Sequence, residues 1–203
     1  MADVLRYGDT IRLINGYANF NGGYLDGCER RELPPDARLG VQTAVSPNRD
    51  NGSGSWRVES AGGKPTGAEV LSCDPVHLFN LHRDDGGYLA VFGQAAPPEL
   101  YLVGTTPQVG GPLGEPQTWH LFADAAVEDD GKIRIGEAVR LLNGRNHGQG
   151  GFLDSCGSRS RPGSLYGVYT SRLSDRGVRL GAHHCTGLWR IVRAGQPVPC
   201  ASP

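Results

Sequence analysis

One short motif, two glycines followed by an aromatic residue and a leucine, occurs three times in this chain of 203 residues. The copies are Gly22-Gly23-Tyr24-Leu25, Gly86-Gly87-Tyr88-Leu89 and Gly150-Gly151-Phe152-Leu153, each 64 residues after the one before. Self-similarity at a fixed spacing is typical of repeat architectures. The chain therefore consists of three internal repeats of one unit, and its fold must give the three copies equivalent surroundings.

Three further elements recur in the same order around each copy. An alternating apolar run ending in asparagine precedes the motif, and a Val-x-Thr fragment and a tryptophan run follow it. The asparagines and tryptophans are Asn15, Asn80, Asn143, Trp56, Trp119 and Trp189. Alternation of period two is typical of half-buried strands. The 31 glycines and 14 prolines between these runs favour tight turns over helices, so we expect an all-β chain.

The repeat predicts a single domain over residues 1–203. Its lobes span about 7–60, 68–124 and 132–194, and a tail follows at 195–203. A unit of about 60 residues with four short strands cannot bury its own apolar face, so the three lobes must close on each other. We expect the three tryptophans to lie at equivalent places in the shared core.

The tryptophan runs also carry a family resemblance. Gln117-Thr118-Trp119 matches the Gln-x-Trp signature of ricin-type lobes, and Gly8–Leu13 followed by Gly23-Tyr24-Leu25 looks like the MIR pattern. Over nearly its whole length the chain resembles the β-trefoil superfamily, both the ricin-B-type lectins and the MIR domains. The resemblance implies a β-trefoil of three pseudo-repeats with four strands each.

The likeness to ricin-type lobes implies shallow sugar sites in lobes one and three, each built from an aspartate, a polar residue and an aromatic residue. Sugar recognition needs planar polar side chains that fork onto adjacent hydroxyls, together with an aromatic face. The candidate ligand-binding residues are Asn15, Tyr17, Asn19, Asn21 and Asp26 in lobe one and Asn143, Asn146, His147, Gln149 and Asp154 in lobe three. Ala90 replaces the aspartate in lobe two, which we expect to be empty. Alternatively, the two aspartates cap turns by accepting backbone N–H bonds.

Two other function classes remain open besides a carbohydrate-binding, lectin-like protein. One is a protein-interaction module of MIR type, and the other is a small stand-alone enzyme of specialised metabolism on the same scaffold. No recognised catalytic motif is present. If the chain is an enzyme, the asymmetric loops are the place for its pocket. These loops hold His82, Asp84, Asp85, His183 and His184.

Composition and charge limit the classes of partner and cofactor that we expect for this chain. Twenty basic and twenty-one acidic residues give a net charge of −1, which disfavours general attraction to nucleic acid, and no apolar run is long enough to span a membrane. Five cysteines without a Cys-x-x-Cys pair indicate neither a zinc site nor a disulfide framework, and no cofactor is expected. The start of the sequence lacks an apolar signal region, so we expect a cytoplasmic protein with reduced thiols, or a secreted one if a leader has been removed. The expected ligand is a carbohydrate, another small molecule or a protein.

Overall fold

A computed structural model describes residues 3–28, 33–110, 115–124, 130–158, 163–174 and 185–195. The prediction of an all-β chain is confirmed, since within these ranges four single turns of helix are all that interrupts the strands. The strands are β1 (Thr10–Asn15), β2 (Tyr24–Cys28), β3 (Gly40–Ala44), β4 (Trp56–Ser60), β5 (Pro75–Asn80), β6 (Gly87–Gln94), β7 (Tyr101–Thr106), β8 (Trp119–Ala123), β9 (Ala138–Asn143), β10 (Phe152–Ser158), β11 (Ser164–Ser171) and β12 (Trp189–Arg193). The helical turns are α1 (Tyr17–Phe20), η1 (His82–Asp84), η2 (Glu115–Gln117) and α2 (Arg145–Gly148).

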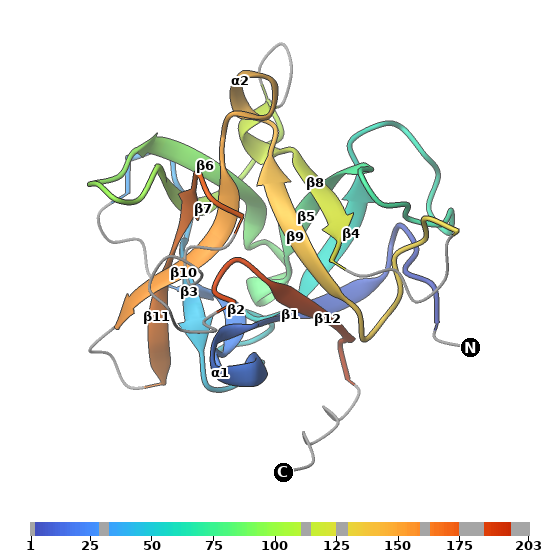
Figure 1. Cartoon of the computed structure of the whole chain (residues 1–203), viewed down its shortest axis with the longest axis horizontal. Helices are drawn as coiled ribbons and strands as arrows, with labels where there is room; N and C mark the ends of the chain where they lie inside the picture. Colours follow the sequence, from blue (N-terminus) through green and yellow to red (C-terminus); the bar gives the residue numbers. More distant parts are fainter. Residues whose placement is uncertain are drawn as a thin grey trace.

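The strands form a closed antiparallel barrel (Figure 1). The wall is a cycle of pairings that runs β1–β4–β5–β8–β9–β12 and returns to β1. The remaining strands form the hairpins β2–β3, β6–β7 and β10–β11, and their second strands β3, β7 and β11 also pair with one another. Each predicted lobe contributes two wall strands and one hairpin to this arrangement.

Backbone hydrogen bonds join three segments, one from each lobe or from the chain just before it, in a ring. The N–H of Leu5 donates to the carbonyl of Ile133 (2.8 Å), that of Ile133 to Val70 (3.0 Å), and that of Val70 back to Leu5 (2.9 Å). All three side chains are fully buried. The ring satisfies backbone groups that are withdrawn from water, as buried N–H and C=O groups require.

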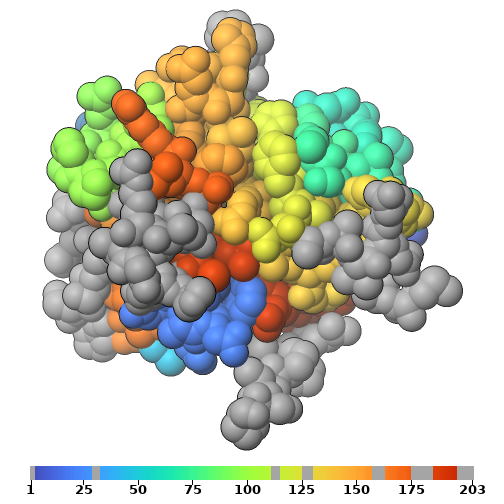
Figure 2. All heavy atoms as spheres, in the orientation of Figure 1, coloured from blue at the N-terminus to red at the C-terminus, as the bar shows by residue number. Residues whose placement is uncertain are grey.

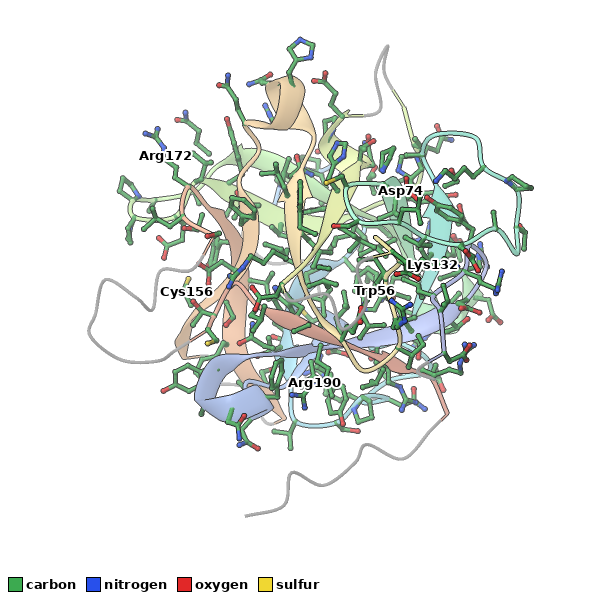
Figure 3. All side chains as sticks on the ribbon, turned by 45° about the vertical axis from the view of Figure 1, so that its right-hand side comes forward. Trp56, Asp74, Lys132, Cys156, Arg172 and Arg190 are labelled. Atoms are coloured by element: carbon green, nitrogen blue, oxygen red, sulfur yellow. The ribbon has the colours of Figure 1, made fainter. Side chains whose placement is uncertain are left out.

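The tryptophans occupy equivalent places in one core, as the sequence predicts. Each is fully buried, and Figure 3 shows Trp56 deep inside the barrel. The indole Nε1–H of Trp56 donates to the carbonyl of Leu25 at 2.9 Å, and two matching bonds repeat this contact. They join Trp119 to Leu89 (2.9 Å) and Trp189 to Leu153 (3.0 Å). The leucine of each glycine-glycine motif is thus the acceptor that satisfies the tryptophan of the same lobe.

None of the helical turns in the described part of the chain has the length and apolar character needed to cross a bilayer.

Candidate functional site

A tight turn links the first two strands of every lobe, and a buried asparagine holds each turn in place. In lobe one, Asn15 is fully buried, and its Oδ1 accepts from the backbone N–H of Tyr17 (3.2 Å) and from Ser155 Oγ (2.9 Å). Its Nδ2 donates to the carbonyl of Thr186 at 2.7 Å. The whole amide of this predicted ligand-binding residue is therefore engaged inside the protein.

The same arrangement recurs in the other two lobes. Asn80 Oδ1 accepts from the N–H of His82 (3.0 Å) while its Nδ2 donates to the Ser53 carbonyl (2.8 Å). Asn143 Oδ1 accepts from the N–H of Arg145 (3.0 Å) while its Nδ2 donates to the carbonyl of Pro116 (3.0 Å). Both asparagines are fully buried. Asn143, the second predicted ligand-binding asparagine, thus has the same structural role as Asn15.

Asp26 is also buried, and it forms an ion pair instead of facing solvent. One carboxylate oxygen accepts from an Arg49 guanidinium nitrogen at 2.6 Å, and the other accepts from Ser53 Oγ at 2.5 Å. Its side chain is 0% exposed and that of Arg49 is 26% exposed. Burial raises the pKa of Asp26, although Ser53 and Arg49 act in the opposite direction. The carboxylate is inaccessible to a ligand, and its partners come from the loop before β4 rather than from a capped turn.

The Asp26–Arg49 pair belongs to a polar network between lobes one and three. Arg49 donates to Ser164 Oγ at 3.1 Å, and the Gln42 carboxamide lies beside both groups. With its oxygen towards Arg49, Gln42 accepts from both guanidinium nitrogens at 2.9 Å. Such a network fixes the loop before β4 against the start of β11. In lobe three, Asp154 is likewise fully buried, and in lobe two the matching Ala90 is buried in an apolar setting.

The tip of the lobe-one turn carries accessible side chains. Tyr17 lies against Tyr166 of β11, with ring centroids 5.1 Å apart and planes at 61°. Asn19 is exposed, and exposed Asn21 donates its Nδ2 to the carbonyl of Ala18 (2.8 Å). Tyr17, Asn19 and Asn21 therefore lie on one turn at the surface, and the carboxylate of Asp26 is buried and does not join them.

The tip of the lobe-three turn is polar and fully presented to solvent. Asn146, His147 and Gln149 are exposed, and the side chain of His147 is 87% exposed. Glu115 of η2 supports this turn, because its carboxylate accepts from the N–H of Asn146 (3.0 Å) and lies 3.4 Å from His147 Nδ1. Figure 2 shows the α2 turn standing at the top of the face, well separated from the lobe-one residues in blue.

The lobe-two turn carries three of the residues proposed for a pocket if the chain is an enzyme: His82, Asp84 and Asp85. His82 Nδ1 lies 3.0 Å from the carbonyl of Asp50, and exposed Asp85 pairs with Arg38 (2.5 Å). Asp84 is also exposed. This turn is thus a charged, solvated surface on which the histidine faces a backbone carbonyl. His183 and His184 lie outside the described residues.

In the parts of the chain that the structure describes, no three His, Cys, Asp or Glu side chains are grouped so that they could hold a metal ion. Cys28, Cys73, Cys156 and Cys185 are present as thiols. Cys28 and Cys156 stand at matching places in β2 and β10, and the Sγ of Cys156 donates to Glu99 at 3.0 Å.

Neither protein-family models nor curated protein sequences show a match to this chain. Solved structures do. The SDF2-like protein from Arabidopsis thaliana is similar with a TM-score of 0.66 and 15% identity, over 93% of this chain and 94% of that one. The Saccharomyces cerevisiae protein O-mannosyltransferase Pmt1-Pmt2 complex bound to the sugar donor is similar with a TM-score of 0.63 and 17% identity, over 98% of this chain and 27% of that one. The botulinum neurotoxin serotype D binding domain is similar with a TM-score of 0.61 and 10% identity, over 96% of this chain and 44% of that one. At these identities the likeness shows the fold alone.

Proposed function

We propose that the chain is a β-trefoil binding module of MIR type, which contacts a protein partner through the tips of its three turns. One observation carries the proposal: buried asparagines hold all three turns in the same way, while the side chains at the exposed tips differ from lobe to lobe. A fixed scaffold that presents variable loops is typical of recognition surfaces.

The threefold contacts support the β-trefoil assignment. The ring of Leu5, Val70 and Ile133 and the three tryptophan–leucine bonds each repeat once per lobe. The MIR-like opening of lobe one and the likeness to the SDF2-like protein and the mannosyltransferase complex support the choice of subfamily. The likeness to a protein O-mannosyltransferase also favours a role in which proteins or their sugars are recognised.

A photo-crosslinker placed at single positions tests this function. Residues Asn19, Asp84 and Asn146 lie at the three tips, and Lys64 lies on an unrelated loop as the matched control. We expect the tip positions to crosslink one and the same protein while the control does not. Equal labelling from Lys64, or different proteins at every tip, would exclude recognition by the turns.

A lectin-like site in lobe one is the second candidate, and the Tyr17–Tyr166 ring pair beside Asn19 and Asn21 favours it. The rings provide an aromatic face and the amides provide paired donors and acceptors. A glycan array probed with the labelled chain distinguishes this lectin-like site from the protein-binding role of the turns. Sugar-competable binding that Tyr17→Ala and Asn19→Ala abolish supports the lectin, whereas a blank array with the folded chain excludes it.

A further inference from the structure

A cluster of aromatic and charged side chains lies on the outer wall of the barrel, away from the turns. It is formed where β4, β5 and β6 run beside one another, right of centre in Figure 1 for β4 and β5. The register places Arg57 opposite Phe79, Glu59 opposite His77, and Phe79 opposite Tyr88. Residues opposite each other on neighbouring strands, and two apart on one strand, share a face. These five side chains therefore form one surface, the β4–β6 wall cluster.

The wall cluster is held in a defined geometry. The rings of Phe79 and Tyr88 meet at 67° with centroids 4.9 Å apart, and the guanidinium carbon of Arg57 lies 4.8 Å from the centre of the Phe79 ring. Glu59 accepts from Arg57 Nε at 2.8 Å and from Tyr88 Oη at 3.2 Å. Arg57 and Glu59 are 41% and 30% exposed, so this arrangement is open to solvent.

His77 completes the cluster. Its ring lies 5.9 Å from that of Tyr88, at 74°. Its Nδ1 is 3.1 Å from the carbonyl of Gln117, and because a carbonyl only accepts, Nδ1 carries a hydrogen there. This contact fixes the ring orientation and leaves Nε2 as the nitrogen available to a ligand.

The equivalent walls of the barrel lack this combination. The strand register identifies the residues on the other two walls that occupy the positions of the five cluster residues. The matching sets are Arg190, Val192, Arg12, Ile14 and Tyr24 on one wall, and His120, Phe122, Arg140, Leu142 and Phe152 on the other. Neither set contains a carboxylate, and on the first wall Phe20 of the α1 turn covers Arg190 at 3.6 Å. On the other wall Arg140 pairs with Asp124, which follows the end of β8 and lies outside the matching set (2.9 Å). Among the described residues of these three walls, the β4–β6 wall is the one whose own set joins an aromatic pair to an arginine–glutamate pair.

We infer that the β4–β6 wall cluster binds an uncharged pyranose ring. The aromatic rings offer apolar surface for the C–H side of the sugar, beside the Arg57 guanidinium that covers one face of Phe79. That guanidinium and the adjacent carboxylate offer a strong donor and a strong acceptor for neighbouring hydroxyls. A neutral polyol satisfies both groups at once. A phosphate would be repelled by Glu59 and an amine by Arg57, so the paired charges select against charged ligands. This places a sugar site on the wall where lobes one and two meet, away from the turn positions on which the motif pattern places its sugar sites.

Two-dimensional ¹H–¹⁵N NMR of the full chain tests the site. The probes are the methyl glycosides of α-mannose, β-glucose and β-galactose, with glucose 6-phosphate and glucosamine as charged analogues of the same ring. We expect saturable shifts for at least one methyl glycoside at the amides of β4, β5 and β6, with weaker effects of the charged analogues. Shifts confined to residues 17–21, 82–85 and 145–149, or no saturable shift with any glycoside, would overturn the inference.

Variants make the assignment specific. Glu59→Gln keeps the shape but removes the carboxylate, and Phe79→Leu keeps much of the volume but removes the ring, so each should weaken binding about tenfold. Tyr24→Phe, which removes a hydroxyl at the position on the first wall that matches Tyr88, should leave binding unchanged. Wild-type affinity in both wall variants, with folded spectra, would refute the site. Because no turn residue is changed, this test is independent of the proposed role of the turns.

Discussion

The side-chain oxygen of Asn80 lies less than 3.0 Å from the position that a Cβ on Gly86 would occupy. Real Cβ atoms do not approach other atoms so closely, and the neighbouring backbone is part of the same contact. The pairs Asn15–Gly22 and Asn143–Gly150 show the same approach. The first glycine of each repeated motif is therefore required by the buried asparagine that precedes it in the chain.

Gly86→Ala should consequently destabilise the protein by about 1–3 kcal/mol, because the added methyl group collides with Asn80 in a packed interior. Gly93→Ala is the matched control, since a Cβ on Gly93 would meet no atom within 4 Å and its φ is not in the left-handed region. Urea unfolding followed by tryptophan fluorescence measures both. Equal stability of the two variants would contradict the proposed collision.

Removing the asparagine itself tests the other half of this contact. Asn80→Ala leaves the N–H of His82 without its partner, at a cost of about 1–3 kcal/mol if that group stays buried. It also removes one of the two donors to the carbonyl of Ser53, which keeps its bond from the N–H of Gly27 (2.8 Å). Asn19→Ala, at an exposed tip, should change the free energy of unfolding by less than about 0.5 kcal/mol. Hydrogen exchange should also quicken at His82 in the first variant. A stable Asn80→Ala protein with unchanged exchange would show that the turn holds without this side chain.

The pattern of the sequence predicted these elements better than it predicted the site. Glycine pairs and alternating apolar residues mark strands and turns locally, and the tryptophans had to be buried in any closed body. The burial of Asp26 depends on Arg49, which comes from a loop 23 residues later and which no local pattern connects to it. The role of Asn15 depends on Thr186, at the other end of the chain.

The wall cluster was missed for a related reason. Its members come from three strands and alternate with core residues, so they never form a motif along the chain. A comparison of outward positions between lobes could have found it, since Glu59 stands where the other lobes have Phe122 and Val192.

The three tryptophans should be energetically equivalent. Replacing each by phenylalanine leaves a small cavity and removes the donor to Leu25, Leu89 or Leu153, so every variant should lose a few kcal/mol of stability, and the three should agree to within about 1 kcal/mol. Chemical unfolding monitored by far-ultraviolet circular dichroism provides the comparison. A variant with nearly wild-type stability would show that its lobe contributes little to the common core.

Asp26 should give the stability of the protein a distinct pH dependence. Burial raises its pKa in the folded state above the usual value of 3.8, so the native state holds this proton more tightly than the unfolded chain. Stability must then fall as the pH rises from about 3.8 through the raised folded-state pKa, because the carboxyl loses its proton and leaves a buried charge. The amide in Asp26→Asn does not titrate, so this variant lacks the pH-dependent contribution of Asp26. The contributions of the other titratable groups cancel when the free energies of unfolding of the two proteins are subtracted. The free energy of unfolding of Asp26→Asn, minus that of the wild type, should therefore increase between pH 4 and pH 7. If this difference decreased instead, attraction to Arg49 would outweigh the cost of burying the charge. The network with Gln42 and Ser164 would then be held together chiefly by that ion pair.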